Sequence, residues 1–161
     1  MTIQGDLLRQ AMWRWTSGVC IVTSRSGDRQ HGMTVNSFTS VSLEPPMVTV
    51  TLAHKTRTYQ LVNLSGVFGV TILSQSQREI AELFSGKAPE DEDRIGKVET
   101  FALSTGVPFL SGGLVFLDCL VRHFVPMTSS TLFIGEVDAV QYAKLDKPLV
   151  YHNRLYHRLA P

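Results

Sequence analysis

The sequence predicts a mainly β protein, an antiparallel barrel with a few flanking helices. Short apolar runs and period-two alternation recur along the 161 residues, separated by glycine, proline or small polar residues. The strand-like segments lie close together in the chain, which favours antiparallel pairing. Because no succession of strand–helix–strand units occurs, a doubly wound Rossmann fold is excluded. With 43% hydrophobic residues and no linker, residues 1–161 are expected to form a single domain.

An apolar stripe at helical spacing predicts the first helix, with Asp6 as its N-cap and Gly18 as its end. The stripe consists of Leu8, Ala11, Met12 and Trp15. We expect this face, together with Trp13, to pack against the core.

Four predicted elements follow the first helix. Residues 19–24 form a strand, and the turn Ser26-Gly27-Asp28 reverses the chain. Residues 31–43 alternate hydroxyl and apolar side chains and are predicted as one strand, with Asn36 as a candidate kink and His31 as a turn residue at its start. Pro45-Pro46 ends that strand, and residues 47–53 form the next one.

The rest of the chain continues this pattern. The polar turn 54–58 leads into a short helix that ends at Ser65-Gly66, and 67–73 is again a strand. Ser74 and Gln77 have capping-box spacing, which predicts a helix from Ser74 to about Phe84. Residues 85–100 are predicted to be a surface loop. The last predicted strands are 114–125, 131–142, 149–152 and 155–159.

Composition excludes several classes of function. A net charge of +1 gives no reason to expect a nucleic-acid partner or an anionic membrane surface. No apolar run is long enough to cross a bilayer, and the N-terminus lacks the pattern of a signal peptide, so the cytoplasm is the expected location. Cys20 and Cys119 lie in apolar strands and are expected to be buried thiols.

The familiar catalytic motifs are absent from the sequence. It contains no GxGxxG after a strand, no phosphate-binding GxxxxGK[ST] and no nucleophile elbow. Neither the cysteines nor the five histidines have metal-ligand spacing, so no metal site is expected.

Two polar segments remain as candidates for binding. Residues 34–42 offer hydroxyl and backbone groups along a strand, which suit the edge of a flavin ring. Residues 54–58 place Lys55 and Arg57 between Thr56 and Thr58, a combination that suits a terminal phosphate. By residue type alone, a strand with surface hydroxyls followed by a solvated turn is the favoured interpretation.

Longer stretches of the chain resemble the flavin reductase-like family, the short-chain NAD(P)H:flavin oxidoreductases. The run GMTVNSFTSVSLEPPMVTVTL (32–52) resembles the family signature, and SGVFGVTILSQSQREIAELFSG (65–86) resembles its middle strand and helix. GVPFLSGGLVFLDCLV (106–121), LFIGEVDAV (132–140) and PLVYHNRLYHRL (148–159) resemble its C-terminal half. The resemblance implies a split β-barrel, a homodimer with flavin near the interface, and hydride transfer from NAD(P)H to FMN or FAD.

The resemblance also implies where the flavin binds. The residues that it assigns are Met33, Thr34, Val35, Asn36 and Ser37 along the ring, Ser40, Val41 and Ser42 beneath the ring and ribityl chain, Ala53, His54, Lys55, Thr56, Arg57 and Thr58 at the ribityl chain and phosphate, Phe84 near the open face, and Arg94 in a loop similar to the family's Asp-Arg/Lys-Phe. Tyr156 is either a packing residue or a neighbour of the cofactor. No side chain is required as a general acid or base.

Two departures from the family pattern affect this assignment. Ile95 stands where the family loop has an aromatic residue. Ser130 stands where many members have a histidine that helps to place the nicotinamide, and a hydroxyl can donate a hydrogen bond but cannot carry a positive charge.

Three functions are therefore weighed, the last of which is a flavin-free barrel with only a structural or partner-binding role. The first is a reductase that supplies reduced flavin to a partner monooxygenase or another acceptor. The alternative is a non-reductase flavoprotein, an electron-transfer module that another protein reduces. The sequence leaves open NADH against NADPH, FMN against FAD, and whether the flavin is held or released.

Overall fold

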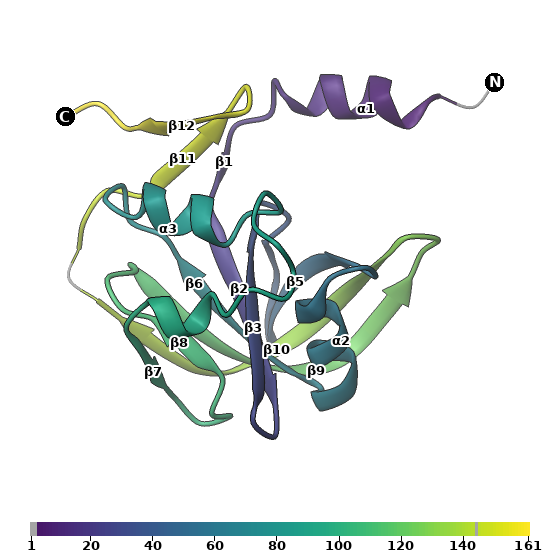
Figure 1. Cartoon of the computed structure of the whole chain (residues 1–161), viewed down its shortest axis with the longest axis vertical. Coiled ribbons are helices and arrows are strands. Elements are labelled where there is room, and N and C mark those ends of the chain that lie inside the picture. The colour runs from purple at the N-terminus through teal and green to yellow at the C-terminus, as the bar shows by residue number, and fades with distance from the viewer. Residues whose placement is uncertain (1–2, 144) are drawn as a thin grey trace.

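The computed structural model describes residues 3–143 and 145–161 (Figure 1). The elements in chain order are α1 (Gly5–Met12), β1 (Ser17–Gly18), β2 (Cys20–Ser26), β3 (Arg29–Val35), β4 (Thr39–Leu43), β5 (Pro46–Ala53), α2 (Arg57–Ser65), β6 (Val67–Ile72), α3 (Arg78–Leu83), a 3-10 turn (Ile95–Lys97), β7 (Thr100–Ala102), β8 (Pro108–Leu110), β9 (Val115–Pro126), β10 (Ser130–Tyr142), β11 (Leu149–His152) and β12 (Leu155–Arg158). Strands dominate and helices are few, which confirms the predicted mainly β, antiparallel class.

A seven-stranded antiparallel sheet forms the body of the molecule, in the order β3-β2-β6-β9-β10-β5-β4. Its two outermost strands, β3 and β4, are consecutive in the chain and are joined by residues 36–38 alone. Three residues span at most about 10 Å, so the sheet must curl until its edges approach one another. Two small sheets, β1-β11-β12 and β7-β8, complete the fold.

The main core lies on the inner face of this curled sheet, where alternate residues of the strands point inward. Val22 from β2, Val50 from β5 and Phe68 from β6 are fully buried there. A Cβ added at Gly135 on β10 would lie 2.5 Å from the Phe68 ring, so only glycine allows this close packing. Cys20 and Cys119 are buried free thiols, as predicted.

The predicted strand 31–43 is in fact two strands. β3 ends at Val35, residues 36–38 turn away, and β4 begins at Thr39. The Ser37 hydroxyl takes part in this break, because it accepts from the Thr51 N–H at 3.1 Å in the place of a ladder bond. Asn36 was correctly predicted to mark a kink, but the kink moves the chain from one edge of the sheet to the other.

The expectations for the first helix are mostly wrong. α1 ends at Met12, Gly18 belongs to β1, and Gln4 takes the N-cap position while Asp6 lies in the first turn. No residue of α1 is buried, and Trp15 is 65% exposed. Figure 1 shows α1 standing off the sheet beside the β11–β12 hairpin. At its C-terminal end the β11–β12 hairpin holds Trp13: the Asn153 N–H donates to the Trp13 carbonyl at 2.9 Å, and Arg154 stacks on the Trp13 ring, at 5.2 Å from guanidinium carbon to ring centroid.

Of the other two helices, α2 begins and ends close to its predicted bounds, and α3 begins four residues after its predicted start. Thr56 caps α2 by accepting from the Tyr59 N–H, and Gly66 ends it in the left-handed region with φ of 71°. The Gln77 side chain accepts from the Ser74 N–H at 3.1 Å, as in a capping box. Nevertheless α3 starts only at Arg78, because Ser74 to Gln77 form a separate turn.

The segment after α3 departs further from its prediction. Residues 85–100 include the buried pair Arg94 and Ile95 and a 3-10 turn, so this loop penetrates the molecule rather than lying wholly on its surface. The short strands β7 and β8 were not predicted.

Within the part of the chain that the structure describes, no helix has the length and apolar character needed to span a membrane.

Candidate flavin site

A pocket of about 230 Å³ opens where β3 ends. Its lining combines the predicted ring-binding segment with residues from three other places in the chain, namely Val19, Thr34, Val35, Asn36, Ser85, Gly86, Tyr151 and Tyr156. Small, polar and aromatic groups therefore converge on one cavity, which is typical of a ligand site. Burial, with a smaller effect of the neighbouring Tyr151, raises the pKa of Tyr156, so its phenol stays protonated.

Among the described residues no strand pairs with the outer edge of β3, which is held instead by the C-terminal end of α3. The Thr34 N–H donates to the Phe84 carbonyl at 2.9 Å, and the Thr34 hydroxyl donates to the Ala81 carbonyl at 2.7 Å. In an antiparallel strand the N–H and C=O of one residue point the same way. The Thr34 carbonyl therefore also faces this outer edge, toward the pocket.

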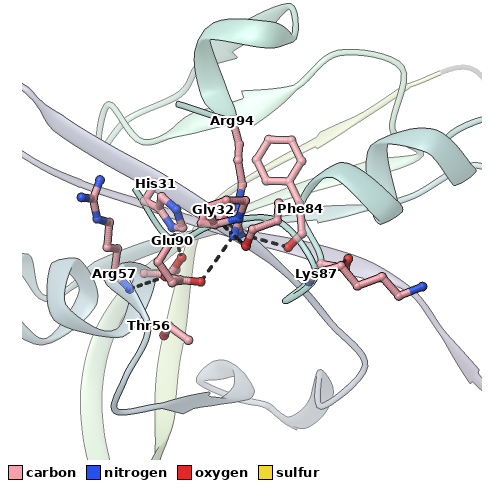
Figure 2. Close-up of polar contacts among 12 residues, drawn as sticks. His31, Gly32, Thr56, Arg57, Phe84, Lys87, Glu90 and Arg94 are labelled. Atoms are coloured by element: carbon pink, nitrogen blue, oxygen red, sulfur yellow. Dashed lines mark hydrogen bonds and ion pairs between the residues drawn. The ribbon is translucent and has the colours of Figure 1, made fainter. Parts of the chain in front are cut away.

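Arg94 ties the loop to β3 (Figure 2). Its side chain is fully buried, and its guanidinium donates to the carbonyls of Gly32 and Phe84 at 3.3 Å each and of Ala88 at 2.8 Å. One of its nitrogens, Nη2, also lies 3.4 Å from the Glu90 carboxylate. Arg94 is thus a buried organiser of the loop, and its charge is matched by Glu90.

The predicted phosphate segment lies at the N-terminus of α2. Lys55 and Arg57 project into solvent, while Thr56 and Thr58 are buried. His54 faces the opposite way and hydrogen-bonds the Thr131 hydroxyl at 2.9 Å. The Arg57 N–H points out of the first turn and donates to Oε2 of Glu90 at 2.9 Å.

His31 was predicted to be a turn residue, and this is wrong. It lies within β3 and is only 3% exposed, with Nδ1 2.9 Å from the Thr58 hydroxyl. Its Nε2 has no hydrogen-bond partner among the described residues. Burial lowers the pKa of His31, Arg94 and Arg57 lower it further, and Glu90 partly offsets them. The imidazole is therefore neutral at pH 7.

The remaining predicted residues are spread around these two sites. Ser40, Val41 and Ser42 lie on β4 and are exposed or half-buried, and Met33 and Ser37 are half-buried beside the pocket lining. The Phe84 ring is 0% exposed and packs in the core, so only its main chain approaches the pocket. Ser130 begins β10 opposite Ala53 and is not part of the lining.

Sequence reasoning missed several site residues. Ser85, Gly86 and Tyr151 line the pocket, and Glu90 reaches the start of α2 from 33 positions along the chain. Nothing local marks these residues, because each acts through a contact made only in the folded chain. Within residues 3–143 and 145–161 no group of His, Cys, Asp or Glu could hold a metal ion.

The chain is similar to known proteins over almost its whole length. The family model of the flavin reductase-like domain matches residues 12–160. An NADH-dependent flavin reductase of Rhodococcus sp is 37% identical over 155 residues, covering 94% of this chain and 85% of that protein.

Solved structures of flavin reductases are also similar to this chain in fold. The styrene monooxygenase flavin reductase from Pseudomonas putida S12 superposes with a TM-score of 0.84 at 33% identity, covering 96% of this chain and 97% of that one. An NADH:FAD oxidoreductase of Streptomyces globisporus C-1027, in complex with NAD and FAD fragments, gives 0.88 at 25% identity, covering 100% and 98%.

Proposed function

The chain belongs to the flavin reductase-like domain family, and we propose that it is an NADH-dependent flavin reductase that transfers hydride to FMN. The observation that carries this proposal is the convergence of the β3 edge, the 85–86 segment and two tyrosines on one pocket at the end of β3. The Rhodococcus and Pseudomonas relatives support the reductase activity. The electron-transfer alternative has no counterpart among the relatives described above.

The residues present fit a flavin by their chemistry. The outward Thr34 carbonyl and the Asn36 amide offer an acceptor and donors to a polar ring edge, and Tyr151 and Tyr156 offer apolar faces. Beyond the pocket, Lys55, Arg57 and the first N–H groups of α2 suit the phosphate. We therefore assign the ring to the pocket and the phosphate to the start of α2.

A bound flavin supplies the hydride-accepting chemistry, and the protein supplies binding and orientation. β3 is fixed at its outer edge by Phe84 and Arg94, so Thr34 to Asn36 form a rigid support for the ring. We assign no side chain as general acid or base. Ser130, at the start of β10, is our candidate for a hydrogen bond to the nicotinamide carboxamide.

We further infer that the protein acts as a homodimer and that its curled sheet is the family's split β-barrel. The apolar face of α1 supports the first inference, because Leu7, Leu8 and Met12 are more than half exposed on a helix that stands off the body. We take residues 1–161 as one such domain and place it in the cytoplasm, where its buried free thiols would stay reduced.

The acceptor of the reduced flavin is proposed to be a separate monooxygenase. The name of the Pseudomonas relative supports this, since that protein is the flavin reductase of a styrene monooxygenase. FAD is retained as a second candidate flavin, as the Streptomyces relative is named for it.

The proposal is tested by mixing the purified protein anaerobically with FMN and NADH and following the flavin absorbance at roughly 450 nm, the band that bleaches as the cofactor is reduced. Bleaching faster than in a protein-free control supports a reductase. Bound, yellow FMN that NADH does not bleach would overturn it in favour of a module reduced by another protein.

A further inference from the structure

We propose that the Glu90 carboxylate occupies the position of the flavin phosphate, and that a phosphorylated flavin must displace Glu90 in order to bind. This inference rests on the proposed function. It adds a carboxylate that competes with the flavin phosphate and so lowers the affinity of that site for phosphorylated flavins. Glu90 bridges two positive groups there, through Oε2 to the Arg57 N–H at 2.9 Å and through Oε1 to Arg94 Nη2 at 3.4 Å (Figure 2).

The start of α2 calls for an anion. The first N–H groups of a helix have no partner within it, and the aligned peptide dipoles make this end positive. The first turn of α2 contains no acidic residue, and the Thr56 hydroxyl is already used by the Tyr59 N–H. The chain therefore satisfies the Arg57 N–H with a carboxylate from a distant loop.

A second observation points to a ligand with more acceptors than a carboxylate. His31 is buried next to this cluster, with its Nδ1 on Thr58 and its Nε2 without a partner among the described residues. His31 and Arg57 both line the adjoining groove of about 780 Å³. A phosphate has three terminal oxygens and up to two negative charges, so it can accept from more donors than Glu90 does.

Glu90 can leave without dismantling the loop. Its side chain is 37% exposed, whereas that of Arg94 is fully buried. When Glu90 withdraws, the Arg94 guanidinium keeps its bonds to the carbonyls of Gly32, Phe84, Ala88 and Pro89. The arriving phosphate replaces the lost negative charge beside Arg94.

The consequence is a selective weakening of FMN binding. Riboflavin has no phosphate and does not need to displace Glu90, so its affinity is unaffected. A flavin held weakly at its phosphate is suited to be released after reduction, which makes FMN a substrate of this protein rather than a fixed prosthetic group.

The test compares Glu90→Gln with Glu92→Gln, which removes the same charge from the same loop but from a carboxylate that pairs with Lys97. Dissociation constants for FMN and riboflavin are measured by quenching of flavin fluorescence. For Glu90→Gln we expect FMN to bind about 5-fold or more tightly and riboflavin to change less than about 2-fold, because one charged competitor is removed. For Glu92→Gln we expect both constants to stay near those of the wild type.

An unchanged or weakened FMN affinity in Glu90→Gln, with riboflavin still bound, would overturn the inference alone. If the wild type binds neither flavin, the proposed function fails and the inference with it. Should Glu90→Gln not fold, Glu90→Asp keeps the charge for Arg94 but shortens the reach to the Arg57 N–H, and the same selective gain for FMN is expected.

Discussion

The two halves of the candidate site are prepared for a ligand in opposite ways. On the ring side, the edge of β3 is pinned by Phe84 and Arg94, and an open pocket of about 230 Å³ lies beside it. On the phosphate side, the start of α2 already holds an anion, the Glu90 carboxylate. We infer from this difference that the ring pocket would determine which cofactor class is recognised, while the α2 end would determine how tightly its phosphate is held.

The largest effect is expected from Arg94, which connects the two halves. Arg94→Leu removes a donor from the carbonyls of Gly32, Phe84 and Ala88, and it removes one of the two partners of the Glu90 carboxylate. We expect a loss of about 3 kcal/mol or more in the free energy of unfolding. Urea denaturation measures this loss. A variant as stable as the wild type would show that Arg94 does not organise the loop.

Removing the cations at the start of α2 distinguishes most clearly between the phosphate side and the ring side of the candidate site. Lys55→Ala combined with Arg57→Ala is expected to weaken FMN by about 10- to 100-fold, since a phosphate loses two charged partners, and to leave riboflavin nearly unchanged. Lys97→Ala with Arg122→Ala removes two exposed cations elsewhere and serves as the control. Equal weakening of both flavins would contradict the phosphate assignment.

The matching change on the ring side is Asn36→Ala. Asn36 is exposed and lines the pocket, so its loss should not disturb folding. We expect FMN and riboflavin to weaken together by about 5-fold, the effect of one lost hydrogen bond. Calorimetric titration of both ligands checks this. A loss confined to FMN would place the phosphate, rather than the ring, at this pocket.

Ser130→His tests whether the nicotinamide carboxamide docks at the start of β10. If the carboxamide docks near the start of β10, an imidazole in place of the hydroxyl should lower the KM for NADH about 3-fold, because an imidazole that carries a positive charge donates a stronger hydrogen bond. Steady-state turnover at saturating FMN measures it. An unchanged KM would remove Ser130 from the site.

The smallest effect concerns His31, which lies between the halves beside Arg94, Glu90, Arg57 and Thr58. Its pKa is lowered in the folded state, so the unfolded chain binds more protons as the pH falls below the ordinary value of about 6.5. The stability that His31 contributes is present above that pH and lost as the pH falls through its lowered pKa. On acidification the Tm of His31→Asn should therefore fall less than the Tm of the wild type. An equal fall in both proteins would show that His31 is not the titrating group.

The sequence predicted local features well and contacts between distant segments poorly. Alternation identified most strands, and Thr56 and Gly66 mark the ends of α2 because caps and left-handed turns depend on single residues. The break at 36–38 was read as a kink within one strand, since period-two alternation continues across it. The buried positions of His31 and Arg94 depend on the loop after α3 folding back onto β3, which no local pattern records.

In the candidate site too, local features could be predicted and contacts between distant segments could not. Resemblance to the family drew attention to Thr34 to Asn36, which line the pocket, but the exposed apolar stripe of α1 was mistaken for a core face. An amphipathic stripe shows only that a helix has an apolar side, and not whether its own chain or a partner covers that side. The role of Glu90 could not be predicted, because Glu90 lies in a charged stretch whose composition is that of an ordinary surface loop.

The most direct test of the two-part site is a crystal structure with FMN bound. We expect the ring to lie against Thr34 to Asn36 and the phosphate to accept from the Arg57 N–H, with the Glu90 carboxylate moved away from that group. A phosphate bound elsewhere, with Glu90 still hydrogen-bonded to Arg57, would contradict it.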